Sequence, residues 1–158
     1  MGPNEIFDKL KAEFGEAVIS FSDQQPTDPF ILVSAPQLFD ICHTLRDHED
    51  FLFDYLMSLS GMDLGENVGV VYHLYSMKYK HKLVLKVIVP KTEPKVPSVE
   101  RIWRTSDWHE REAYDLIGIQ FEGHHNLIRI LCPYDWEGHS LRKDYQSPES
   151  YHGMKISY

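Results

Sequence analysis

The chain has 158 residues, 42% of them hydrophobic, and a formal net charge of −8 at pH 7. This length suits one domain with an appended segment, and the negative charge argues against binding to nucleic acid or to an anionic lipid surface. No apolar run approaches the roughly 18 residues that span a bilayer, and no secretory signal is visible. With two cysteines, Cys42 and Cys132, the chain cannot supply the four thiolates that an iron–sulfur cluster normally takes.

The N-terminal segment predicts a helix followed by two strands. Asn4 is a potential N-cap, apolar residues recur at helical spacing after it, and Gly15 is a typical helix stop. Residues 17–21 and 30–33 are rich in strand-forming residues, and the polar residues 22–29 between them predict a loop.

A second helix is predicted after Ser34, which forms a capping box with Gln37. Its apolar face is formed by Leu38, Ile41, Cys42 and Leu45, which follow the i, i+3, i+4, i+7 pattern. Cys42 is therefore predicted to be a core residue rather than a reactive thiol, since a free cysteine usually packs as a small hydrophobic side chain.

The middle of the chain predicts a hairpin. Residues 51–62 are apolar and aromatic and predict a short helix or turn that leads into a strand. Residues 68–77 and 82–89 are two β-rich runs joined by the polar turn 78–81. One face of the second run carries Leu83, Leu85, Val87 and Val89. Lys86 points to the opposite face, which we expect to be only partly covered.

The last third begins with a linker, residues 90–97, that contains three prolines. A short helix is predicted for Ser98–Arg104. Asp107 and Glu110 then form a second capping signal for a helix that runs to about Ile117.

From residue 121 onward no helical or strand period is sustained. The element order predicts an α+β fold: a single domain, residues 1–122, with a mainly antiparallel sheet packed by helices. Residues 123–158 form an extended C-terminal interaction segment. A structureless segment of this length is improbable inside a compact free domain. We therefore hypothesise that it is poorly ordered alone and folds against a partner.

The helix before this segment brings charged residues to one face. Arg111 and Asp115 are spaced i, i+4, and Glu112 and Asp115 are spaced i, i+3. They could form an acid pair for proton transfer or a structural salt-bridge cluster. We favour the cluster, because a neighbouring arginine lowers the pKa of a carboxyl group, whereas a general acid needs a raised pKa.

Five histidines lie late in the chain: His109, His124, His125, His139 and His152. Their spacing matches no zinc-binding motif, so no metal site is predicted. His124 and His139 each follow a glycine and are expected to be neutral imidazoles that bond to the backbone and shape turns. No phosphate-binding loop or nucleophile elbow is present in the sequence.

Two blocks of this sequence resemble the 30-kilodalton-type (C) subunit of respiratory complex I, the NADH–quinone oxidoreductase. The first block is formed by Glu110, Arg111, Glu112, Asp115, Gly118, Ile119, Phe121, Gly123 and His124, and the second runs from Arg129 to Tyr145. Two linked blocks of this length are far more specific than a lone short motif.

The chain departs from the family pattern at three positions. His125 and Ser140 stand where the family usually has proline, and Ile117 stands where an aromatic residue is common. Losing two prolines loosens the backbone locally, because proline fixes φ.

The resemblance implies an accessory subunit of the peripheral arm, with no catalytic, cofactor-binding or metal-binding residue of its own. NADH, FMN, the iron–sulfur clusters and quinone would belong to the assembled complex, which couples electron transfer to proton translocation. The subunit would dock on the hydrogenase-like quinone-site subunit and the iron–sulfur subunits. It would lie peripherally on the cytoplasmic side of the cell inner membrane.

The expected partner interface uses the second block, since Trp, Tyr and Arg dominate interface hot spots. Its residues are Arg129, Asp135, Trp136, Gly138, His139, Arg142, Lys143, Asp144 and Tyr145. Two alternatives stay open at this point. One is the equivalent subunit of a membrane-bound hydrogenase or of a complex linked to F420 or ferredoxin. The other, more distant, is a stand-alone metal-dependent hydrolase that uses the histidines and carboxylates.

Overall fold

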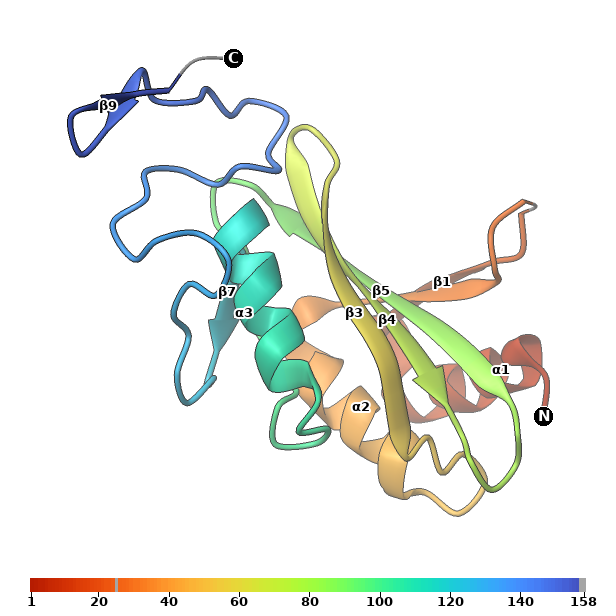
Figure 1. The fold of residues 1–158 in the computed structure, drawn as a ribbon. Coiled ribbons are helices and arrows are strands. Elements are labelled where there is room, and N and C mark those ends of the chain that lie inside the picture. The colour runs from red at the N-terminus through yellow and green to blue at the C-terminus, as the bar shows by residue number, and fades with distance from the viewer. Residues whose placement is uncertain (25, 157–158) are drawn as a thin grey trace.

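The computed structural model describes residues 1–24 and 26–156 and folds them into a helix-packed sheet followed by a long irregular tail (Figure 1). The helices are α1 (Pro3–Phe14), α2 (Leu38–Asp47) and α3 (Ser106–Ile117), with short 3-10 turns η1 (Gly15–Ala17) and η2 (Ala35–Gln37). The strands are β1 (Val18–Ser22), β2 (Phe30–Val33), β3 (Tyr55–Asp63), β4 (Asn67–Tyr75), β5 (Lys82–Pro90), β6 (Lys95–Pro97), β7 (Gln120–Glu122), β8 (Ser150–Tyr151) and β9 (Met154–Lys155).

Five strands form the main sheet in the order β1-β2-β5-β4-β3. The β1–β2, β3–β4 and β4–β5 pairs are antiparallel, and the β2–β5 pair is parallel. A parallel pair needs a long crossover, and the chain between β2 and β5 provides one through α2 and the β3–β4 hairpin. The expected α+β fold with a mainly antiparallel sheet is confirmed, as is the hairpin of β4 and β5.

One hydrophobic core joins the sheet to its helices. Cys42 on α2 lies fully buried in it, which confirms its predicted place in the core, and burial raises the pKa of its thiol far above the ordinary value. The predicted apolar face of β5 is buried, while Lys86 on the opposite face is half-buried. Gly61 in β3 lets α3 approach closely, because a Cβ there would lie 3.1 Å from Ile117 and 3.2 Å from Ala113.

The predicted helix caps are wrong in detail. The first helix starts at Pro3 with Gly2 as its N-cap, not Asn4, and the Glu5 carboxylate accepts the Gly2 N–H at 2.9 Å. Ser34 precedes the 3-10 turn η2 and makes no side-chain cap bond, so the predicted capping box with Gln37 does not form. These misses share a cause: a proline in the first turn of each segment fixes φ and starts the helical turn.

Two further expectations about residues 90–117 are corrected. Residues 98–104 form turns rather than a helix, and the preceding linker contains β6, which pairs in parallel with β7. The helix α3 begins at Ser106, and Glu110 does not cap it, because its carboxylate bonds instead to Ser98 and Val99.

The tail, residues 123–156 of the described chain, lies beside the C-terminal end of α3 and finishes in the small β8–β9 hairpin (Figure 1). Apart from this hairpin it has no helix or strand within the described residues, as the sequence predicted for most of its length. None of the described helices is both long enough and apolar enough to cross a membrane.

Candidate docking surface

The tail closes the C-terminal end of α3. The last carbonyl groups of a helix have no partner within the helix and need one from outside. Here the Asp115 carbonyl accepts from His139 Nδ1 at 2.9 Å, and the Leu116 carbonyl accepts from the Leu141 N–H at 3.0 Å. The Ile117 carbonyl accepts from Arg142 Nε at 2.6 Å. The second sequence block thus caps the helix that carries the first, and the arginine also complements the negative end of the helix dipole.

Asp115 is the centre of this contact. Its fully buried carboxylate pairs with Arg129 Nη1 at 2.7 Å. Its second oxygen accepts three consecutive backbone N–H groups, from Ile130 at 3.1 Å, Leu131 at 2.7 Å and Cys132 at 2.8 Å. Burial alone would raise the pKa of this carboxyl, but these bonds hold the pKa below its ordinary value. Asp115 therefore stays ionised and anchors the start of the tail.

The predicted pairing of Arg111 with Asp115 is wrong. The Arg111 guanidinium turns away and donates to the carbonyl groups of Ile128 and Arg129 instead. Glu112 is exposed and does not join the cluster. The preference for a structural role over an acid pair agrees with the lowered pKa of Asp115, although its cation comes from the tail rather than from the helix.

Two constraints require a glycine at position 118, the signature residue that follows α3. Its φ is +82°, in the left-handed region, and a Cβ there would lie 2.5 Å from the His139 ring and 2.7 Å from Arg142 Nη2. We expect Gly118→Ala to lower the free energy of unfolding by about 1–3 kcal/mol, as for other strained backbone positions, and to loosen the tail. Urea denaturation measures the first effect, and hydrogen exchange at residues 139–142 measures the second.

Gly123→Ala is the matched control for this prediction. Gly123 also has a positive φ, +83°, but no atom lies within 4 Å of a Cβ built there. It therefore carries the backbone strain without the crowding. Equal loss of stability in both variants, with unchanged exchange at residues 139–142, would mean that contact with the tail does not constrain Gly118.

Lys143 ties the tail to the main sheet. Its N–H donates to Asp63 at the end of β3 at 2.7 Å, and the Lys91 ammonium lies 2.9 Å from the same carboxylate oxygen. Burial opposes ionisation of Asp63, yet the N–H groups of Lys143 and Gly65, together with Lys91, lower its pKa to about 2. This contact fastens the end of the second block to the domain.

Glu110, the first residue of the first block, is fully buried. Its carboxylate accepts the Ser98 hydroxyl at 2.5 Å and the Val99 N–H at 2.8 Å. Burial is the main cause that raises its pKa to about 7, and the charges of Glu100 and Asp107 add to it. The burial of this acid was not predicted from the sequence. Its spacing of three and seven residues from the core residues Ala113 and Ile117 was the available signal.

One histidine cluster has a composition that could hold a metal ion. Ligand atoms of Asp107, His124 and His125 lie within 4.8 Å of one another. However, the Asn126 N–H donates to His124 Nδ1 at 3.0 Å, which places the proton of the neutral ring on Nε2. That nitrogen faces Asp107, whose carbonyl it meets at 3.2 Å. The ring is therefore arranged as a hydrogen-bond donor rather than as a metal ligand.

The expected hydrogen bonds from imidazole rings to the backbone are confirmed for both histidines that follow a glycine. His124 meets the Asp107 carbonyl, and His139 meets the Asp115 carbonyl. Burial lowers the pKa of His139, as do Arg142 and Arg129 nearby, so that this ring stays neutral.

The nine expected interface residues divide into two groups. Arg129, His139, Arg142 and the Lys143 N–H bond into the domain, while Asp135, Gly138 and Asp144 are exposed and Trp136 and Tyr145 are half-buried. Exposed apolar side chains accompany the second group: Trp108, Ile128, Leu131, Tyr134 and Leu141 are each more than half exposed, Tyr134 by 91%. We call these five residues the candidate docking surface.

Residues 31–151 match the family described as respiratory-chain NADH dehydrogenase, 30 Kd subunit. The chain is 48% identical to the C subunit of the NADH-quinone oxidoreductase of Chloroherpeton thalassium, an alignment that covers 99% of this chain and 66% of the relative. It is 42% identical to the counterpart from Chlorobium phaeobacteroides, over 96% of this chain and 93% of the relative. It is 40% identical to the counterpart from Mycolicibacterium smegmatis, over 89% of this chain and 60% of the relative. The chain thus spans about two thirds or less of two of these three relatives.

Two solved structures share the fold. A trypsin-resistant fragment (1–134) of Nqo5 superposes with a TM-score of 0.64 at 24% identity, covering 78% of this chain and 98% of the fragment. A chain of the membrane-bound sulfane sulfur reductase, an archaeal respiratory membrane complex, superposes with a TM-score of 0.62 at 19% identity, covering 77% and 71%. At these identities the likeness concerns the fold alone.

Proposed function

Since this chain belongs to the family of the 30 kDa subunit of respiratory-chain NADH dehydrogenase, we propose that it is an accessory subunit of the peripheral arm of an NADH–quinone oxidoreductase. Its role is positional. It docks on the hydrogenase-like quinone-site subunit and the iron–sulfur subunits, on the cytoplasmic side of the cell inner membrane. The cofactors of electron transfer, NADH, FMN, iron–sulfur clusters and quinone, are held by those partners.

One observation carries this proposal. The second block uses its charged side chains to fasten the tail onto α3 and leaves apolar side chains exposed beside it. A free monomer gains nothing from displaying Leu131, Tyr134 and Leu141 to water, whereas a subunit buries them on assembly.

Two alternatives have less support. The sulfane sulfur reductase chain shares the fold at 19% identity, while the relatives of 40–48% identity are subunits of NADH-quinone oxidoreductase. A metal-dependent hydrolase would need the Asp107–His124–His125 cluster as ligands, and the proton on His124 Nε2 opposes that use.

Co-purification tests the proposal. A tag on the N-terminus suits this purpose, because that end lies on the opposite side of the molecule from the tail (Figure 1). From membranes solubilised in mild detergent, we expect iron–sulfur and quinone-site subunits to accompany the tag, with NADH–quinone reductase activity in the eluate. Recovery with hydrogenase activity would assign the chain to the related complex. A lone soluble protein with stoichiometric metal would refute the proposal.

Trp136→Ala is expected to lower the amount of assembled complex by about tenfold or more, as for an interface hot spot worth at least about 2 kcal/mol. Remaining activity should scale with the remaining complex, because the role is positional. Met77→Ala is the control, since Met77 is 62% exposed in the β4–β5 turn, which lies at the opposite end of the sheet from the tail (Figure 1). Normal assembly with collapsed specific activity would instead indicate a direct part in catalysis.

A further inference from the structure

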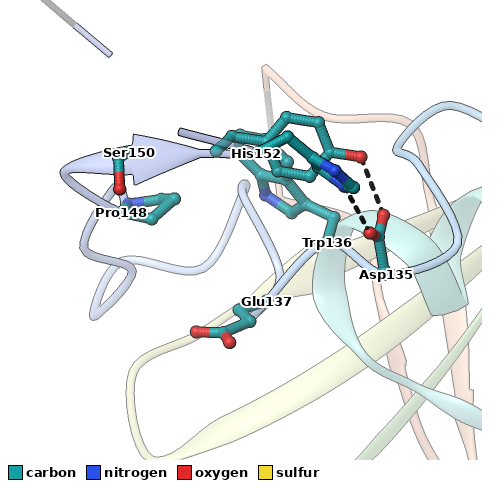
Figure 2. A pocket seen from close by; sticks show the side chains of 7 residues that line it. Asp135, Trp136, Glu137, Pro148, Ser150 and His152 are labelled. Atoms are coloured by element: carbon teal, nitrogen blue, oxygen red, sulfur yellow. Dashed lines mark hydrogen bonds and ion pairs between the residues drawn. The ribbon is translucent and has the colours of Figure 1, made fainter. Parts of the chain in front are cut away.

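The middle of the second block and the region of the β8–β9 hairpin line a pocket of about 360 Å³ (Figure 2). Asp135, Trp136 and Glu137 form one side, and Tyr151 and His152 of the hairpin region form the other. No lysine or arginine is among the residues that line it. The pocket therefore combines two carboxylates with aromatic rings and no permanent positive charge.

The Asp135 carboxylate is held in place by the hairpin. Tyr151 Oη donates to one of its oxygens at 2.7 Å, and His152 Nε2 lies 2.7 Å from the other, as the dashed lines in Figure 2 show. These bonds lower the pKa of Asp135, so the group is ionised at neutral pH. Each oxygen keeps a further lone pair for an additional donor.

The aromatic side chains of the pocket are also held in place by their neighbours. The Trp136 and Tyr151 rings lie 5.2 Å apart between centroids, tilted by 49°. The indole N–H of Trp136 donates to Tyr145 Oη at 3.1 Å, and Arg129 Nη2 donates to the Trp136 carbonyl at 2.8 Å. A rigid ring beside an ionised carboxylate is the arrangement that binds a cation both through its face and through hydrogen bonds.

We propose that this pocket receives an arginine side chain presented by the subunit on which the chain docks. The inference rests on the proposed function and adds the chemistry of one contact. Arginine fits better than lysine, because its planar guanidinium stacks on an aromatic ring such as that of Trp136 while its N–H groups donate to a carboxylate of the pocket. An apolar side chain would offer no donor to the Glu137 carboxylate or to the remaining lone pairs of Asp135, and a carboxylate that is buried in an interface without a donor weakens that interface.

Site-specific cross-linking in the assembled complex identifies the occupant. Ser150 lines the pocket and is exposed, so p-benzoyl-phenylalanine placed there reaches whatever enters. We expect a cross-link to a partner peptide with an arginine beside the attachment point, and none from the same probe at Glu13, an exposed residue of α1. Attachment to a segment with only lysine or apolar residues, or only within the chain, would overturn the inference.

A charge-neutralising pair gives an independent test. Glu137→Gln removes a pocket carboxylate, and Glu149→Gln removes an exposed carboxylate of the same tail that does not line the pocket. We expect Glu137→Gln to weaken partner retention about three- to tenfold at low salt, with the difference fading near about 0.5 M salt, and Glu149→Gln to have little effect. Equal behaviour of both variants would contradict the inference.

These outcomes separate the inference from the proposed function. If the unmodified chain retains its partner subunits while the cross-link and the Glu137→Gln effect fail, the arginine contact alone is wrong. If the unmodified chain retains no partner subunit, the proposed function is wrong and the inference falls with it.

Discussion

Replacing Asp115 by alanine is expected to lower the free energy of unfolding of the chain by about 3–5 kcal/mol, the usual cost of removing one member of a buried ion pair. The loss leaves the Arg129 guanidinium and three backbone N–H groups without their shared acceptor. Urea denaturation gives the energy, and hydrogen exchange at residues 130–132 should rise at the same time because the tail loses its anchor.

Glu112→Ala is the control within the same signature. Glu112 precedes Asp115 by one turn of α3, but it is exposed and is not part of the tail contact. We expect a change of less than about 0.5 kcal/mol, as for an ordinary surface substitution. If the two variants lost the same stability, the buried Asp115 network would not be what holds the tail.

Hydrogen exchange of the isolated chain also reports whether the free tail is ordered. The sequence predicts that residues 123–158 are poorly ordered until they bind, and this stays a prediction, with residues 157–158 outside the described part. The Asp115→Ala prediction opposes it for residues 130–132, because a stability loss in the isolated chain requires that their bonds to Asp115 form there. In a tail that orders on binding, we expect order to begin at the contacts of Asp115, Arg142 and Lys143. Full protection of residues 130–145 in the isolated chain would contradict poor order in the free state.

Local patterns predicted most of the fold. The alternating apolar residues of β5 and the i, i+3, i+4, i+7 face of α2 depend on neighbouring residues alone, and both agree with the structure. The β6–β7 pair was missed because two three-residue strands separated by α3 carry no period of their own. The helix predicted at residues 98–104 does not form, and Ser98 and Val99 at its expected start bond instead to the distant Glu110 carboxylate.

The difference between local patterns and contacts of distant segments also explains how much of the candidate site could be predicted. The signature blocks could be located in the sequence, but not the direction in which their side chains point. Helical spacing paired Arg111 with Asp115, whereas the folded tail brings Arg129, 14 residues away, to the carboxylate together with three N–H groups. These four bonds stabilise the Asp115 carboxylate more than one ion pair along the helix would, because such an exposed pair contributes only about 0.3–0.5 kcal/mol. Long-range contacts of this kind follow no spacing rule in the sequence.

Glu110→Gln is expected to make the chain less sensitive to pH than the unmodified protein. The folded-state pKa of Glu110 is raised from 4.5 to about 7, so between these values the folded chain binds more protons than the unfolded chain. Its contribution to stability is therefore fully present below pH 4.5 and is lost as the pH rises through about 7. A shift of this size corresponds to roughly 3 kcal/mol over that window.

Glutamine keeps the hydrogen bonds of the protonated acid, since its carbonyl can accept the Val99 N–H while its amide donates to the Ser98 hydroxyl. The titratable groups near Glu110 are the same in both proteins, so the comparison isolates the charge of residue 110. They are Cys42 on α2, Tyr72 on β4, Glu100, Asp107 and His124, whose Nε2 lies 3.9 Å from the carboxylate. Urea denaturation from about pH 4.5 to 8 should thus give similar stability at the acid end and a growing advantage for the variant, reaching roughly 3 kcal/mol above about pH 7. Parallel stability curves would contradict the raised pKa of Glu110, and His124 Nε2, which lies 3.9 Å from the carboxylate, would then be the partner that keeps the buried acid ionised.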